Sequence, residues 1–93
     1  MSVRDTIEAK LTAALAPVRL DVEDDSESHR GHGGWREGGE THFNVVAVAA
    51  AFDGLSRVAR QRLILDALSE EMAGPVHALS MRCQTPLEAA AAG

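Results

Sequence analysis

A switch in the spacing of apolar residues at Pro17 restricts the first part of this chain to a helix followed by a strand. Before the proline, one apolar residue recurs every four positions: Val3, Ile7, Leu11 and Leu15. This spacing matches one face of an α-helix, and the residue before a proline is disfavoured in the helical conformation. After the proline, apolar and charged residues alternate over 18–23, as expected of a half-buried strand. The switch therefore predicts a helix over 2–15 and a strand that follows at once.

Two further apolar segments predict the rest of a β-sheet. Residues 41–52 are almost continuously apolar and β-branched, which is typical of a central strand covered on much of both faces. Residues 76–83 form a third strand in this interpretation, because Gly74-Pro75 ends the helical segment before them. Pro86 suits the first position of a helix, so we expect a short C-terminal helix or frayed tail over 86–93.

The segment between the second and third strands has the pattern of a helix. Ser56 predicts its N-terminal cap, and the helix runs to about Ala73 or divides into two near Arg60. We expect its apolar stripe to consist of three residues, with Ile64 and Val58 nearby: Leu65, Leu68 and Met72.

The predicted order of elements is α-β-β-α-β-α, with one more helix if the middle one is divided. Helices and sheets bury their apolar faces against each other, so we expect helices on one face of a three-stranded mixed sheet, an α+β fold. A chain of 93 residues makes a single domain over 1–93.

Composition narrows the expected surroundings of this domain. The net charge of −5 argues against whole-surface attraction to nucleic acid or to anionic membranes. Cys83 is the only cysteine, so an intramolecular disulfide is impossible and a reducing compartment fits best. No signal peptide pattern begins the chain, and no apolar run is long enough to cross a bilayer. We therefore expect a cytoplasmic protein, or one of an organellar matrix in a eukaryote.

Residues 24–40 lack any periodic apolar pattern and are rich in glycine, which predicts a long flexible loop. The loop carries His29 and His32. One interpretation is a solvated polar loop. The other is that glycine lets the loop fold back towards His77, so that two or three imidazoles reach one metal. No strong zinc-ligand spacing is present, so a site completed by another protein is easier to satisfy than a structural zinc site.

His77 lies on the predicted third strand and is the first candidate for a functional histidine. Strand alternation places it on one face with Leu79, Met81 and Cys83. It is either a half-buried histidine at the strand edge or a metal ligand or proton carrier. Cys83 is excluded as its companion, because six strand residues separate the two by about 20 Å. For His42, at the start of the second strand, we favour a structural role.

Three basic residues gather in the middle helix: Arg57, Arg60 and Arg62. They serve solubility, phosphate contact or docking to an acidic partner. No aromatic stacking platform accompanies them, which weakens a role in single-strand binding. The chain also lacks a nucleophile with a base, a carboxylate pair or a phosphate-binding glycine loop, so we do not expect an enzyme.

Three stretches together resemble the BolA family. Residues 39–45 are similar to its G-x-E-[ST]-H-F-x-[VL] signature, 52–56 with the following Arg60-x-Arg62 to its next motif, and 68–79 to its helix-to-strand passage. The resemblance covers roughly residues 5–88. Two departures are Gln61, where the family often has histidine, and an Ala-rich tail without the aromatic residue common there.

The resemblance implies an α-β-β-α-α-β-α fold related to the type II KH domain. It also implies a partner, a monothiol glutaredoxin with a Cys-Gly-Phe-Ser site, and a bridging [2Fe–2S] cluster used in iron–sulfur trafficking or iron regulation. Glutaredoxin and its glutathione would supply thiolates, and this chain His77 and His32, with His29 as the alternative loop ligand. We expect a monomer that forms a heterodimer with this partner.

Two other functions stay open at this point. Some members of the family are described as DNA-binding regulators of stress response or cell shape, a role for which Arg57, Arg60 and Arg62 are the candidates. The net charge and the lack of a G-x-x-G clamp argue against it. The third function is divalent-metal storage by the loop histidines.

Overall fold

The computed structural model describes residues 2–25 and 41–92, so His29 and His32 lie outside the described residues. The elements follow the expected order, with the middle helical segment divided in two and a short 3-10 helix (η2) after the second strand. Their bounds are α1 Val3–Leu15, β1 Arg19–Asp24, β2 His42–Val48, η2 Ala50–Phe52, α2 Arg57–Ala67, α3 Ser69–Ala73, β3 Ala78–Gln84 and α4 Pro86–Ala92.

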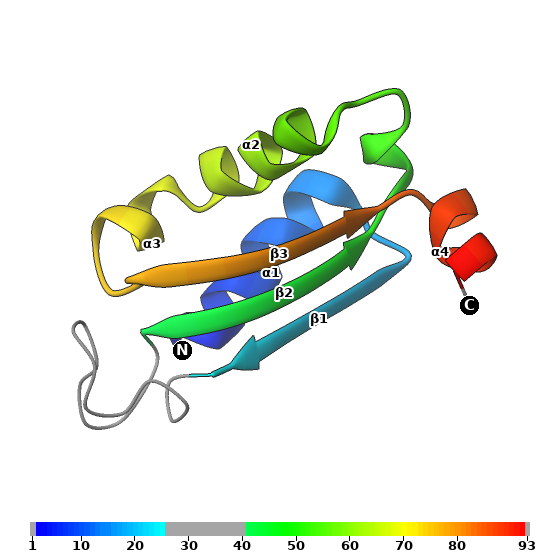
Figure 1. Ribbon diagram of the computed structural model, residues 1–93. Helices are drawn as coiled ribbons and strands as arrows, with labels where there is room; N and C mark the ends of the chain where they lie inside the picture. Colours follow the sequence, from blue (N-terminus) through cyan, green and yellow to red (C-terminus); the bar gives the residue numbers. More distant parts are fainter. Residues whose placement is uncertain (1, 26–40, 93) are drawn as a thin grey trace.

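The three strands form one mixed sheet in the order β1-β2-β3. β1 pairs antiparallel with β2, whereas β2 pairs parallel with β3 through the crossover made by α2 and α3. The parallel register places His42 opposite Ala78 and Ala47 opposite Cys83. The N-terminal ends of β2 and β3 therefore lie at one edge of the sheet, and α4 lies beyond the opposite edge (Figure 1).

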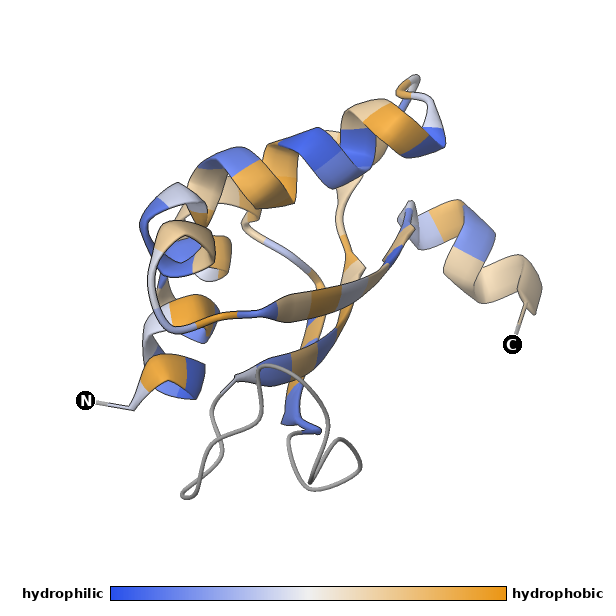
Figure 2. Ribbon diagram, turned by 60° about the vertical axis from the view of Figure 1, so that its left-hand side comes forward, coloured by the Kyte–Doolittle hydropathy of each residue, from blue (hydrophilic) through white to orange (hydrophobic). Residues whose placement is uncertain are grey.

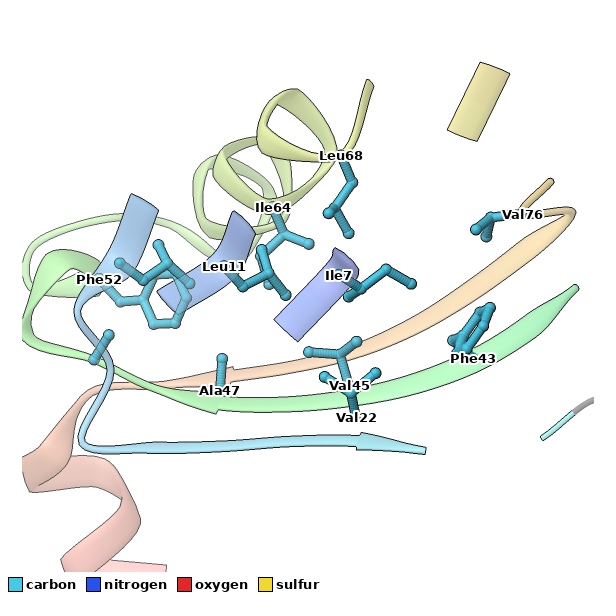
Figure 3. Close-up of a cluster of buried hydrophobic side chains, with 12 residues drawn as sticks. Ile7, Leu11, Val22, Phe43, Val45, Ala47, Phe52, Ile64, Leu68 and Val76 are labelled. Carbon is cyan, nitrogen blue, oxygen red and sulfur yellow. The ribbon is translucent and has the colours of Figure 1, made fainter. Parts of the chain in front are cut away.

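The hydrophobic core lies between one face of the sheet and the helices α1, α2 and α3 (Figures 1 and 3). Hydrophobic and hydrophilic residues are interspersed along the helices and strands (Figure 2), and buried apolar residues of α1, α2, β1 and β2 belong to this core. Twelve buried residues make up the core: Ile7, Leu11, Leu15, Val22, Phe43, Val45, Ala47, Ala49, Phe52, Ile64, Leu68 and Val76. The expected arrangement of helices on one face is confirmed for α1, α2 and α3.

The middle helical segment differs from its prediction in two respects. The break falls at Leu68, between α2 and α3, and Arg60 lies inside α2. Of the expected stripe, Leu68 is buried and Met72 packs against the core, whereas Leu65 is 36% exposed and Ile64 is buried in its place. Residues four apart share one face of a helix, and Leu65 is turned about 100° from Ile64, so packing against α1 selected the neighbouring stripe.

The bounds of all three strands also shift, and β3 runs over Ala78–Gln84 where a strand over 76–83 was expected. Val18, expected to open the first strand, precedes β1, which begins at Arg19, and is 71% exposed. The central strand ends at Val48, and the chain turns through η2 instead of continuing to Phe52. The C-terminal segment is helical: the Thr85 hydroxyl accepts from the Glu88 N–H at 3.1 Å, and the Glu88 carboxylate accepts from the Thr85 N–H at 2.9 Å. This reciprocal cap starts α4, which buries none of its own residues.

Candidate functional site

His77 stands one residue before β3, at the edge where β2 and β3 begin. Its main-chain N–H donates to the Thr41 carbonyl at 2.8 Å, and the N–H of Ala78 donates to the same oxygen at 3.2 Å. The side chain of His77 is exposed, so the interpretation as a half-buried histidine is wrong. The parallel ladder thus fixes the backbone of His77 and leaves its imidazole accessible.

The other residues assigned to the same face behave as strand alternation predicts. Leu79, Met81 and Cys83 are partly buried and pack against the core. His77 differs from them because it lies outside the strand, where the pleat no longer dictates which way a side chain points.

His42 is brought next to His77 by the parallel pairing of β2 and β3. The two ring centroids lie 6.4 Å apart, and the ring planes are inclined by 21°. His42 is only 6% exposed, and its Nδ1 shares a 2.8 Å hydrogen bond with the hydroxyl of the fully buried Thr41. These contacts agree with the structural role favoured from sequence, but sequence reasoning missed the proximity to His77. The available signal was that both histidines begin predicted strands, which become neighbours if the strands run parallel.

Asp25 and Thr41, the described residues that flank 26–40, lie at the same edge of the sheet. The Asp25 N–H donates to the His42 carbonyl at 2.8 Å, and Thr41 accepts from both His77 and Ala78. The described residues on either side of 26–40 are therefore bound directly to the His42 and His77 backbone. Whether His32 or His29 approaches His77 stays a prediction, since both fall outside the described residues.

The described residues do not assemble a complete metal site. Within 2–25 and 41–92, no group of three histidine, cysteine, aspartate or glutamate side chains could hold a metal ion. Cys83 lies towards the opposite end of β3 from His77, opposite Ala47, so its exclusion as a companion ligand is confirmed. Burial raises the pKa of the Cys83 thiol, with Arg60 partly opposing the shift, so burial disfavours its thiolate.

Arg60 has a structural role and is not part of an exposed basic patch. The expectation that Arg57, Arg60 and Arg62 act together is therefore wrong for Arg60. Its guanidinium donates to both carboxylate oxygens of Glu88, at 2.6 and 3.1 Å, and its side chain is 13% exposed. It also donates to the Leu55 carbonyl at 3.0 Å and the Cys83 carbonyl at 3.2 Å. Arg57 and Arg62 are exposed. The helical spacing of the three arginines could not reveal this difference, because the partners of Arg60 come from distant parts of the chain.

The Arg60–Glu88 pair joins α2 to the start of α4. The hydrogen bonds from Arg60 and from the Thr85 backbone lower the pKa of Glu88 to about 2. Glu88 thus carries two roles, as the cap residue of α4 and as the ion-pair partner of α2.

In the described part of the chain, no helix is long and apolar enough to cross a membrane.

Comparison with known proteins connects this geometry to one family. The family described as BolA-like protein matches residues 11–88. Mouse BolA-like protein 1 (Mus musculus) is 44% identical over 86 residues, which cover 92% of this chain and 60% of the mouse protein. The Escherichia coli K12 protein named DNA-binding transcriptional regulator BolA is 41% identical over 85 residues, which cover 91% of this chain and 77% of that protein.

Solved structures show the same similarity in three dimensions. The BolA domain of SufE1 from Arabidopsis thaliana superposes with a TM-score of 0.85 at 46% identity, covering 95% of this chain and 96% of the domain. The chain spans 60% of the length of the mouse relative and 23% of the Arabidopsis SufE-like protein 1, chloroplastic/mitochondrial. The match is therefore to a domain that also occurs inside longer proteins.

Proposed function

We propose that this chain, which belongs to the BolA-like protein family, is a non-enzymatic adaptor that binds a monothiol glutaredoxin. In this role it co-ligates a bridging [2Fe–2S] cluster used in iron–sulfur trafficking or iron regulation. The observation that carries the proposal is the exposed imidazole of His77 on a backbone fixed by the Thr41 carbonyl. A ligand shared between two proteins needs this combination, because it must be accessible to the partner yet fixed in position.

The donor set of the described residues fits a shared cluster better than a resident one. His77 is accessible, and only the buried His42 is found beside it; within 2–25 and 41–92 no group of three metal-binding side chains forms. His32, with His29 as the alternative, is the second ligand that we propose from this chain. The thiolate of the Cys-Gly-Phe-Ser glutaredoxin and that of glutathione would complete the set. Imidazole in place of thiolate raises the reduction potential of such a cluster.

Cluster reconstitution tests this proposal directly. The protein is mixed with a Cys-Gly-Phe-Ser glutaredoxin, glutathione, iron and sulfide, and visible absorption and circular dichroism are recorded. We expect His77→Ala to abolish the spectrum of the heterodimeric cluster, and Ser80→Ala, an exposed change on β3, the strand that follows His77, to leave it intact. His32→Ala and His29→Ala, measured separately, identify the loop ligand. An unchanged spectrum with His77→Ala rejects the ligand assignment.

The assembly state gives a second test. We propose a monomer alone and a one-to-one heterodimer with glutaredoxin, in the cytoplasm or in an organellar matrix. Light scattering coupled to size-exclusion chromatography measures both masses. A stable homodimer that persists in the presence of glutaredoxin contradicts this part of the proposal.

DNA binding is the alternative function, and the name of the Escherichia coli relative favours it. Two observations weigh against it in this chain: Arg60 is bound to Glu88, and Leu68 alone joins α2 to α3, which leaves no room for a G-x-x-G loop there. The expected relation to the type II KH fold stays a prediction.

Gel shifts over a range of salt concentrations test whether the chain binds DNA. Preference for one duplex over a scrambled duplex, lost in Arg57→Gln/Arg62→Gln, would establish the alternative.

A further inference from the structure

A cavity of about 640 Å³ lies between α2, the C-terminal half of β3 and the start of α4. Six of its lining residues carry the argument: Arg57, Arg60, Gln61, Arg82, Gln84 and Glu88. Gln84 pairs with Val48 and Ala78 with His42, so the cavity lies towards the opposite end of the sheet from His77. Its volume is within the range of small-molecule sites.

The charges around this cavity are unbalanced. Arg60 and Glu88 bind each other through two hydrogen bonds and compensate one another. Arg57, on the first turn of α2, and Arg82, on the edge strand β3, are exposed and make no ion pair or side-chain hydrogen bond within the described residues. Two uncompensated positive charges thus border one cavity on a chain whose net charge is −5.

We propose that this cavity binds the phosphate group of a small metabolite. A guanidinium presents a planar fork of N–H donors that matches phosphate oxygens, and two such groups from separate elements match the double charge of a phosphate monoester. The amides of Gln61 and Gln84 can donate further hydrogen bonds. A single carboxylate would leave one of the two arginines without a partner.

A small phosphate ligand fits this surface better than a nucleic acid backbone does. A polyanion needs a track of several basic residues, and its affinity grows with each phosphate neutralised. Here Arg57 and Arg82 are the two uncompensated charges among the residues that line the cavity. The net charge of −5 on the chain repels a long polyanion. This proposal is independent of the proposed glutaredoxin role, since the residues that line the cavity do not include His42 or His77.

Nuclear magnetic resonance titration of the ¹⁵N-labelled chain alone tests the proposal. The probes are inorganic phosphate, adenosine monophosphate and an eight-nucleotide thymidine oligomer, all at constant ionic strength. We expect the amide signals of Arg57, Gln61 and Arg82 to shift with adenosine monophosphate. Arg57→Gln and Arg82→Gln should each weaken the affinity about tenfold, as expected for the loss of a charge-assisted hydrogen bond. The matched control is Arg62→Gln, an exposed change on the same helix outside the cavity lining, which should leave the affinity unchanged.

Three outcomes would overturn the proposal. The first is the absence of shifts at millimolar phosphate and nucleotide. The second is an equal loss of affinity in Arg62→Gln, which would reduce the effect to general charge. The third is tighter binding of the oligomer than of the mononucleotide at equal phosphate concentration, which would assign the site to nucleic acid. Unchanged far-ultraviolet circular dichroism confirms that each variant is folded, and Arg82→Lys offers a second variant that keeps the charge while losing the guanidinium fork.

Discussion

The ring of His42 lies 6.4 Å from the ring of His77, yet the two side chains are in different environments. His42 is buried and hydrogen-bonded to Thr41, whereas His77 is exposed. Two histidines at the same edge of the sheet therefore have separable roles. His42 packs and hydrogen-bonds inside the edge where β2 and β3 begin, and the exposed ring of His77 is accessible from outside.

This separation predicts that two alanine substitutions affect stability to different extents. His42→Ala removes the 2.8 Å hydrogen bond that the ring shares with the buried Thr41 hydroxyl and opens a space in the packing, so we expect a loss of about 1–3 kcal/mol in the free energy of unfolding. His77→Ala removes an exposed side chain and should change it by less than about 0.5 kcal/mol. Urea denaturation of both variants measures the difference. Equal destabilisation would show that His77 is also a structural residue.

The buried face of α2 predicts a contrast between adjacent residues. Ile64 is fully buried in the core, so Ile64→Ala should cost about 2–5 kcal/mol of stability through lost burial and a residual cavity. Leu65 is 36% exposed, and Leu65→Ala should cost markedly less. Chemical denaturation at neutral pH compares them. A larger loss for Leu65→Ala would mean that α2 is turned the other way around its axis.

Arg60 should matter to stability in a way that Arg62 does not. Arg60→Gln removes the bidentate pair with Glu88 and the hydrogen bonds to two backbone carbonyls, and so releases α4 from α2. We expect a lower thermal unfolding midpoint and faster amide hydrogen exchange in 86–92. Arg62→Gln, on the exposed side of the same helix, serves as the control. Equal midpoints for the two variants would contradict the role given to the Arg60–Glu88 pair.

The lowered pKa of Glu88 predicts how acid affects the attachment of α4. Its pKa in the folded chain is about 2, below the ordinary value of 4.5, so the ionised carboxylate stabilises the fold above pH 4.5. That contribution is lost as the pH falls towards 2. The stability difference between the unaltered chain and Glu88→Gln should therefore stay constant from pH 7 to about pH 5 and shrink below it. Urea midpoints measured across this range test it, and a difference independent of pH would refute it.

Much of the fold could be predicted because periodicity is a local property. The Val3–Leu15 stripe, the alternation before Asp24 and the apolar segment of β2 each identify an element and its buried side. The helix break at Leu68 could not be located in this way. It depends on how α2 and α3 pack across the sheet, and an apolar run contains several helical stripes of similar hydrophobicity.

The candidate site likewise has features that local sequence predicts and features that depend on tertiary packing. Its residue types were evident in the sequence, which singled out His77 and excluded Cys83 by the length of one strand. The sequence by itself thus determined the elements, their order and the chemical groups available. Only the tertiary structure decided that His42 lies beside His77, that Arg60 is bound to Glu88, and that Arg57 and Arg82 line one cavity. These relations join residues from different elements, and the pairing of strands and packing of helices that create them are not encoded in local spacing.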